Sequence, residues 1–150
     1  MKVAIANRQR LVPLDRKALR ALCVSVLRAH GVEADLSLCY VADAAIRALN
    51  QRYLGRDEPT DVLAFPLEDG GSETRDSHQF PDERLLGEIV VSAEKALAEA
   101  KRRRIPVARE LALYTAHGVL HLLGYDDHAP ADRRRMRRAE RAALSAAVLM

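Results

Sequence analysis

Aromatic side chains are scarce in this chain of 150 residues, which has no tryptophan, four tyrosines and two phenylalanines. Proteins that bind single nucleic-acid strands by stacking bases need a platform of exposed aromatic rings. Six rings in the whole chain leave little from which to build such a platform. If the protein binds nucleic acid, we expect it to do so mainly through charge.

Cysteine and long apolar runs are also scarce. Cys23 and Cys39 lie in apolar stretches and are too few for a disulfide framework, so we expect two reduced thiols in the core. No stretch approaches the roughly 20 apolar residues that span a bilayer. Asn7 and Arg8 interrupt the first apolar segment before a signal-peptide core can form. These absences predict a cytoplasmic protein that does not contact a membrane.

The rest of the composition is that of an ordinary globular domain. A hydrophobic fraction of 49% with 30% charged residues excludes disordered and collagen-like chains. The length fits one domain, residues 1–150, with a substantial core. The formal net charge is only +3, from 24 basic and 21 acidic residues, but these charges are unevenly placed along the chain.

Hydrophobic periodicity predicts four strands and five helices. We place the strands at residues 2–6, 34–41, 60–65 and 86–92, and the helices at 14–29, 43–53, 93–104, 106–123 and 131–149. Apolar and polar positions alternate over residues 34–41, which predicts the second strand with Ala34, Leu36, Leu38 and Tyr40 on one face. Asp43 is expected to cap the helix that follows. The pattern predicts an α+β fold with α/β layers, in which helices pack on a small four-stranded sheet.

Three segments hold most of the charge imbalance. Residues 68–84 contain six acids and two arginines, and this stretch is long enough to be a mobile or functional flap. Residues 101–110 contain five basic residues and one acid, and the last predicted helix has six arginines against Asp132 and Glu140. Such basic patches bind phosphates without sequence preference, although a solvated helix face has the same composition.

The histidines are clustered. Three of five fall in His117-Gly-Val-Leu-His121-Leu-Leu-Gly-Tyr-Asp-Asp-His128. His117 and His121 are one i,i+4 step apart, so on a helix both can reach one metal ion. We expect Gly124 to end the helix in a left-handed conformation and the next turn to bring His128 back. Three protein ligands with an open position are typical of a catalytic zinc site, here on a central helix.

Gly118 occupies the position at which the metzincin-like motif His-Glu-x-x-His carries its general base. Without that glutamate, peptide hydrolysis lacks its proton acceptor. Phosphodiester hydrolysis needs an activated water and cations for the phosphate oxygens. The motif therefore favours a nuclease over a metalloprotease. The general base stays open, with Asp126, Asp127 and Glu88 as candidates.

Two further segments precede the histidine motif: Pro-Thr-Asp-Val-Leu-Ala-Phe-Pro at residues 59–66 and Leu-Gly-Glu-Ile-Val-Val-Ser at residues 86–92. In this order the three segments resemble the YbeY family of rRNA maturation factors. The resemblance implies a zinc-dependent, single-strand-specific endoribonuclease that acts at the 3′ end of small-subunit rRNA and in ribosome quality control. It also implies a single-stranded rRNA precursor and the small ribosomal subunit as partners, with either a protein of that subunit or an assembly GTPase presenting the substrate.

The chain departs from the family pattern at the third histidine. That histidine stands ten positions after the first in the family, where this chain has Asp127 and places His128 one residue later. We take His117, His121 and His128 as the metal ligands, because a loop absorbs one extra residue at little entropic cost. The alternative is that Asp127 binds the metal and His128 stands behind it.

A second departure lies at Leu54, where the family often has an arginine that faces the substrate cleft. Leucine cannot bind phosphate, and Arg52 and Arg56 flank it. We take these two arginines as candidate RNA-binding residues, with solvated surface arginines as the alternative. The competing functional hypotheses are a metalloprotease-like hydrolase and a non-catalytic ribosome-assembly factor whose zinc is only structural.

Overall fold

The computed structural model describes residues 1–56, 60–66 and 85–148, and within them it has the predicted four strands and five helices. The strands are β1 (Val3–Asn7), β2 (Asp35–Val41), β3 (Val62–Pro66) and β4 (Leu85–Ser92). The helices are α1 (Arg16–Ala29), α2 (Asp43–Leu54), α3 (Ala93–Arg103), α4 (Val107–Leu122) and α5 (Pro130–Val148). The acidic segment 68–84, expected to be a flap, lies outside the described residues.

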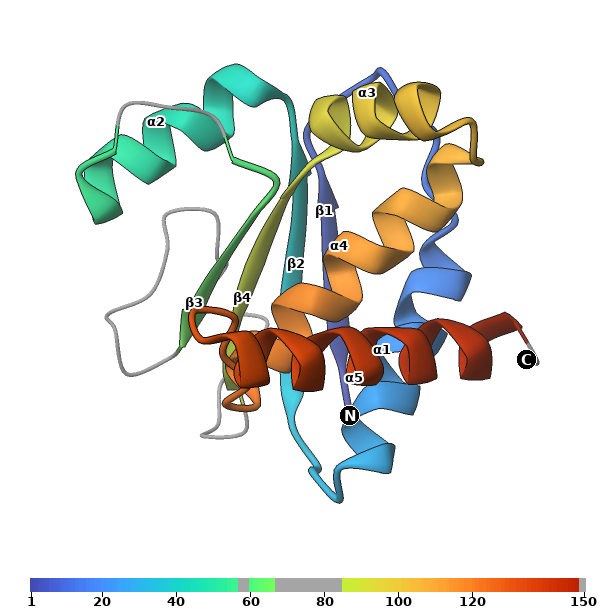
Figure 1. Cartoon of the computed structure of the whole chain (residues 1–150). Coiled ribbons are helices and arrows are strands. Elements are labelled where there is room, and N and C mark those ends of the chain that lie inside the picture. The colour runs from blue at the N-terminus through green and yellow to red at the C-terminus, as the bar shows by residue number, and fades with distance from the viewer. Residues whose placement is uncertain (57–59, 67–84, 149–150) are drawn as a thin grey trace.

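The four strands form one mixed sheet in the order β1-β2-β4-β3 (Figure 1). β1, β2 and β4 are parallel, and β3 runs antiparallel along the edge of β4. Parallel neighbours need a crossover connection, which α1 supplies between β1 and β2. Parallel and antiparallel strands in one sheet, with helices packed on it, confirm the predicted α+β fold class.

Helices cover both faces of the sheet. The larger hydrophobic core packs α1, α3 and α4 against one face, and a smaller cluster with Ile46 of α2 covers the other. The central strand β2 is therefore buried on both sides. Ser37 and Cys39, which lie on the opposite face of β2 from Leu36, Leu38 and Tyr40, are both buried. The burial of Cys39, and of Cys23 in α1, as free cysteines confirms the expectation of two thiols in the core.

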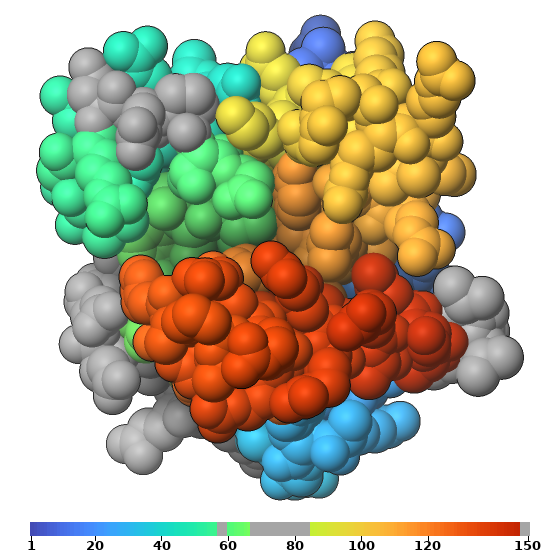
Figure 2. All heavy atoms as spheres, viewed as in Figure 1, coloured from blue at the N-terminus to red at the C-terminus, as the bar shows by residue number. Residues whose placement is uncertain are grey.

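Helix α5 forms an outer layer that crosses α4 and α1 (Figure 1). Its inner side presents Met136 and Ala143, which are buried and belong to the larger core. The space-filling view shows α5 as a continuous ridge across this side of the molecule (Figure 2). Although α5 is 19 residues long, neither it nor any other described helix combines the length and apolar character needed to cross a bilayer.

Two contacts fix α4 on the sheet close to its histidines. The Tyr40 hydroxyl of β2 lies 2.7 Å from the Thr115 hydroxyl, which itself donates to the Leu111 carbonyl at 2.7 Å. At Gly118, an added Cβ would lie 2.5 Å from Cγ2 of Ile89 on β4, closer than side-chain carbons approach. Glycine therefore permits the close approach of helix and sheet, and any larger residue at this position would force Ile89 to shift.

Asp43 does not cap α2 as predicted. Ala42 is the N-cap residue, and Asp43 is the first helical residue. Its carboxylate instead accepts a 2.6 Å hydrogen bond from the hydroxyl of Ser92, which also caps α3 by accepting from the Lys95 N–H. Because β2 and β4 are adjacent parallel strands, their carboxyl ends bring the starts of α2 and α3 together. The Asp43 carboxylate therefore bonds to Ser92 at the end of β4 instead of capping its own helix.

Candidate metal centre

His117 and His121 lie in the last turns of α4, on the same side of the helix as their spacing predicts. Their rings meet edge to face, with centroids 4.6 Å apart. Both side chains are partly exposed, His117 to 24% and His121 to 31%. Because backbone carbonyls at a helix C-terminus carry partial negative charge, this end of α4 favours a bound cation.

The chain leaves α4 through Gly124, whose φ of +103° confirms the positive-φ conformation predicted for it. The Gly124 N–H donates to the His121 carbonyl and the Tyr125 N–H to the Leu120 carbonyl, both at 3.0 Å. This pair of bonds is the Schellman pattern that ends a helix and reverses the chain. The Tyr125 hydroxyl lies 2.9 Å from Nε2 of His30 at the end of α1, which anchors the turn to a second helix.

The next turn directs Asp127 toward the two imidazoles. One carboxylate oxygen of Asp126 accepts from the N–H groups of Asp127 at 2.7 Å and of His128 at 3.2 Å. Such a side-chain turn fixes the backbone over these residues. Oδ2 of Asp127 then lies 3.6 Å from Nε2 of His117 and 3.7 Å from Nε2 of His121.

His128 is not brought to the histidine pair. Its side chain is 88% exposed, and its Nε2 lies 3.5 Å from a carboxylate oxygen of Asp126. The three potential ligand atoms that gather around the helix end, all within 4.8 Å of one another, belong to His117, His121 and Asp127. His128 groups only with Asp126 and Asp127. The structure thus brings together two of the three ligands expected from sequence, with Asp127 beside them.

A carboxylate that the sequence analysis did not select also belongs to this site. Oε2 of Glu140, on α5, lies 2.6 Å from Nδ1 of His117. A signal for it was present, since Glu140 shares the inner side of α5 with Met136 and Ala143. Burial lowers the pKa of His117, but the hydrogen bond and charge of Glu140, with the charge of Asp127, more than offset it and leave that pKa above its usual value.

The donor atoms at this site suit a transition metal. Two imidazole nitrogens and one carboxylate oxygen form one of the three-ligand sets found at catalytic zinc sites, although other divalent transition ions accept the same atoms. The rings are oriented with Nε2 toward Asp127, and Nδ1 of His117 is already occupied by Glu140. The residues present therefore fit the metal that the sequence pattern implies.

The candidate general bases separate in space. Glu88 lies on β4 between Gly87 and Ile89, which both face α4. An added Cβ on Gly87 would meet the Leu122 side chain at 2.8 Å, and Ile89 packs against Gly118. Because side chains alternate along a strand, Glu88 points to the opposite face of the sheet, away from the histidines. Asp126 is engaged in its turn, and Asp127 is the candidate that lies against both imidazoles.

A cavity of about 590 Å³ borders His121. Its other walls come from the end of α2 and from β3 and include Tyr53, Leu54 and Phe65. Leu54 is 56% exposed, so the apolar side chain at the family's arginine position lies at the surface here.

Neither Arg52 nor Arg56, the two candidate RNA-binding residues, is among the described residues that line this cavity. The Arg52 guanidinium lies 5.6 Å from the centroid of the Tyr53 ring.

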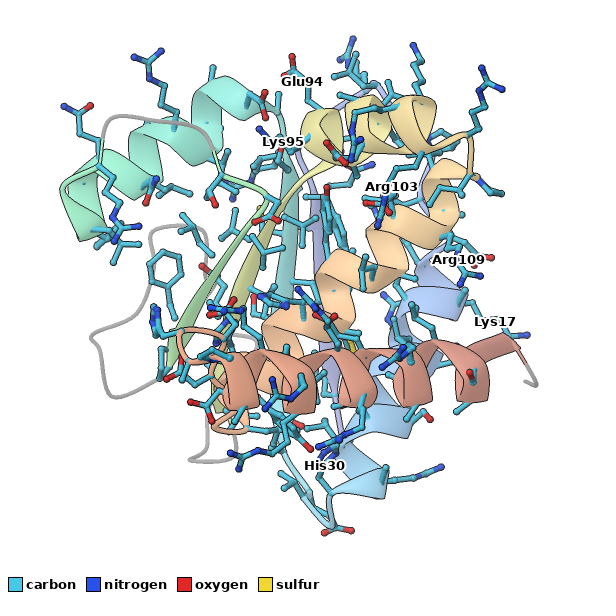
Figure 3. The ribbon with its side chains drawn as sticks, viewed as in Figure 1. Lys17, His30, Glu94, Lys95, Arg103 and Arg109 are labelled. Carbon is cyan, nitrogen blue, oxygen red and sulfur yellow. The ribbon has the colours of Figure 1, made fainter. Side chains whose placement is uncertain are left out.

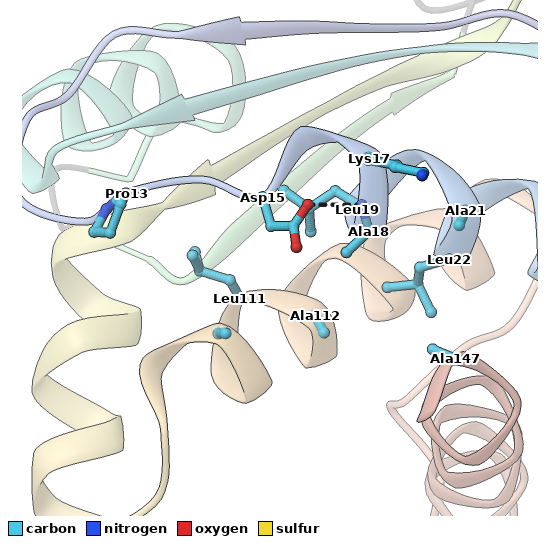
Figure 4. Close-up of a pocket in the computed structure, with 11 residues that line it drawn as sticks. Pro13, Asp15, Lys17, Ala18, Leu19, Ala21, Leu22, Leu111, Ala112 and Ala147 are labelled. Carbon is cyan, nitrogen blue, oxygen red and sulfur yellow. Dashed lines mark hydrogen bonds between the residues drawn. The ribbon is translucent and has the colours of Figure 1, made fainter. Parts of the chain in front are cut away.

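A second cavity, of about 390 Å³, lies between α1, α4 and the end of α5 (Figure 4). Its walls are mostly apolar, with Asp15 and Lys17 at one side. The Asp15 carboxylate caps α1 by accepting from the Ala18 N–H at 3.0 Å. Among the described residues that line this cavity there is no histidine or cysteine, so it is not a competing metal centre.

The structure is that of a small α+β protein whose candidate metal ligands gather at the end of one helix. Residues 4–147 match the model of a family described as Endoribonuclease YbeY, and the chain belongs to this family. The YbeY endoribonuclease of Desulfitobacterium hafniense is 45% identical over 79% of this chain and 75% of the relative. That of Pelotomaculum thermopropionicum is 40% identical over 96% of this chain and 95% of the relative.

The fold itself matches a solved structure. The solution structure of TM1509 from Thermotoga maritima aligns with a TM-score of 0.64 at 24% identity, over 97% of this chain and 88% of that one. This likeness confirms the architecture. The family membership confirms the resemblance carried by the three sequence motifs, and with it an endoribonuclease, a hydrolase acting on RNA phosphodiester bonds.

Proposed function

We propose that this protein is a metal-dependent endoribonuclease that cuts single-stranded RNA, with a small-subunit rRNA precursor as its substrate in the cytoplasm. The observation that carries the proposal is the gathering of three ligand atoms within 4.8 Å at the end of α4, in a chain of the YbeY family. The cavity that borders His121 gives substrate a place beside these atoms. The small ribosomal subunit, through one of its proteins or an assembly GTPase, is the proposed partner.

His117 and His121 through Nε2, with Asp127 through Oδ2, are the proposed ligands of one zinc ion. A zinc ion held there supplies Lewis acidity toward a phosphodiester and its attacking nucleophile. The chain's own residues set the geometry: the Asp126 turn directs Asp127, and Glu140 occupies Nδ1 of His117. Gly118 packs closely on Ile89 and supplies no glutamate base at this position, which supports a nuclease rather than a metalloprotease.

The third ligand is tested by comparing Asp127→Ala with His128→Ala. The turn geometry predicts that Asp127→Ala loses zinc, while His128→Ala keeps close to one zinc per chain. Zinc content after dialysis against metal-free buffer measures this. Because the two substitutions are adjacent, His128→Ala controls for disturbance of the turn. Loss of zinc from the His128 variant alone would restore the ligand set expected from sequence.

The activity is tested with purified protein and a single-stranded rRNA precursor, with and without a chelator. Cleavage is expected with zinc and is expected to stop with chelator and in His117→Ala. Cleavage that persists in His117→Ala identifies a contaminating nuclease. A zinc-loaded protein that binds the precursor without cutting it, and unfolds when zinc is removed, would support the alternative of a structural zinc in an assembly factor.

RNA phosphates also need cations near the metal centre, and one side of α5 offers them. Arg133 of α5 donates to the His128 carbonyl at 2.7 Å. Glu140 of α5 contacts His117. Positions 133 and 140 therefore mark the side of α5 that faces the site. Arg137, four residues after one and three before the other, lies on that side. It is exposed, and within the described part of the chain no hydrogen bond or ion pair is found for it. We propose that Arg137, with Arg52 and Arg56, binds substrate phosphates.

Arg138 provides a matched control, since it is one residue further along α5 and turned about 100° around the helix. Arg137→Ala is expected to weaken binding of single-stranded RNA by about 3- to 10-fold and to lower the salt dependence by about one phosphate contact. Arg138→Ala, with the same charge change, is expected to have a smaller effect. Equal effects would show that only net charge matters. Full cleavage by both Arg52→Ala and Arg56→Ala would remove those residues from the proposal.

A further inference from the structure

The two histidines of the metal centre are held differently. Nδ1 of His117 lies 2.6 Å from Oε2 of Glu140, and both side chains are partly buried. Within the described residues, the ring of His121 has no hydrogen bond, and its neighbours are the His117 ring and the Asp127 carboxylate at 3.7 Å. One imidazole is therefore anchored by a second helix, and the other is oriented only by packing.

The Glu140 contact determines which nitrogen of His117 is available. An ionised carboxylate only accepts hydrogen bonds, so Nδ1 carries the proton and Nε2 keeps its lone pair when the ring is neutral. Nε2 is also the atom that faces Oδ2 of Asp127, at 3.6 Å. The contact thus selects the one tautomer that suits the ligand geometry.

The carboxylate is committed to this contact by its place on α5. Arg137 stands three residues before Glu140, a spacing at which helical side chains readily pair. No ion pair between the two is found in the described part of the chain, and Glu140 instead reaches inward to α4. Met136 and Ala143, at i−4 and i+3, are buried against the core and turn this side of α5 toward His117.

We infer that Glu140 is the positioning residue of the metal centre, holding His117 in the orientation and tautomer in which Nε2 binds the ion. Resting on the proposed function, this inference deepens it by giving α5 a part in metal affinity although α5 supplies no ligand. Docking of α5 on α4 and metal binding are then coupled through one hydrogen bond. Outer partners of this kind change metal affinity by about 10- to 100-fold.

The test compares Glu140→Ala and Glu140→Gln with Asp132→Asn. Glutamine retains an acceptor oxygen but loses the charge. Asp132 lies on the same helix and pairs with Arg135 at 2.9 Å, so its substitution makes the same charge change without removing the contact to His117. Zinc affinity is measured by competition with a chromogenic chelator, and the geometry of the site by the visible absorption spectrum of the cobalt-loaded protein. Thermal unfolding of the metal-free variants shows whether each one folds.

Glu140→Ala is expected to weaken zinc binding by about 10- to 100-fold and to alter the cobalt spectrum, and Glu140→Gln to have a smaller effect of the same sign. Asp132→Asn is expected to match the wild type in both. Wild-type zinc affinity and an unchanged cobalt spectrum in folded Glu140→Ala would overturn the inference and leave the metal proposal intact. If Glu140→Ala does not fold, the glutamine variant decides in the same way. If the wild type binds neither ion, both proposals fail.

Discussion

The two halves of α4 each carry a close contact between a carboxylate and a nitrogen base from neighbouring helices. In the first half, Glu110 of α4 lies 2.7 Å from Arg103 of α3, near the junction of these helices (Figure 3). In the second half, His117 of α4 lies 2.6 Å from Glu140 of α5. The two distances are nearly equal, yet the two contacts serve different purposes.

The two contacts differ in whether they leave a metal-binding atom unoccupied. Glu110 is only 1% exposed, and its partner is a guanidinium that remains charged at every physiological pH. That contact joins two helices and leaves no metal-binding atom free. His117 instead has a second nitrogen, which points toward Asp127 beside His121. A contact between two helices can therefore contribute to a metal site only when one partner keeps an unoccupied metal-binding atom at the surface.

Removing a ligand from the second half should have the largest effect. His121→Ala is expected to reduce zinc binding and RNA cleavage by more than about 100-fold, because only two of the three proposed ligands remain. The metal-free variant should unfold at nearly the wild-type urea concentration, since His121 is partly exposed and has no described hydrogen bond. Zinc content, cleavage and urea unfolding check this. A large decrease in the free energy of unfolding of the metal-free variant would mean that His121 also stabilises the fold without metal.

Removing the contact in the first half should have the opposite signature. Glu110→Ala deletes a buried charged hydrogen bond and is expected to lower the free energy of unfolding by about 2–3 kcal/mol. Zinc affinity should stay within about twofold of the wild type, because the His117 side of α4 is unchanged. Urea unfolding and chelator competition measure the two quantities. Weakened zinc binding in a folded variant would show that the two halves of α4 are coupled.

Gly118, which sets the distance from α4 to the sheet, should give a smaller effect. Gly118→Ala gains about 1 kcal/mol of helix propensity, but its Cβ would meet Ile89 at 2.5 Å, and such overpacking costs about 1–3 kcal/mol. We expect a net loss of about 1 kcal/mol in urea unfolding, with a modest loss of zinc affinity as the histidines shift. A gain in stability would show that Ile89 moves aside.

Sequence periodicity predicted the elements of this fold well because it records burial along one segment at a time. The strands and helices have the expected order, and the i,i+4 spacing of His117 and His121 placed them on one side of a helix. What it missed depends on contacts between distant segments. The contact of Glu140 with His117 depends on how α5 docks on α4, and the hydrogen bond between Asp43 and Ser92 depends on the pairing of β2 with β4. The direction of Asp127 depends on a local side-chain turn at Asp126, which periodicity does not describe.

The smallest expected difference between the two contacts is in how their contribution to stability depends on pH. The pKa of His117 lies above its ordinary value of 6.5, because Glu140 and Asp127 outweigh the effect of burial. In metal-free protein this contact therefore stabilises the fold fully below pH 6.5, and its contribution is lost as the pH rises through the raised pKa. Zinc affinity should move the other way, increasing over the same range as the proton leaves the ligand. Urea unfolding in chelator, at steps from pH 6 to 8, should show a decline that Glu140→Gln reduces, since the Glu140 charge is lost and that of Asp127 remains, and that Glu110→Ala retains. The same slope in the wild type and Glu140→Gln would mean that another group titrates.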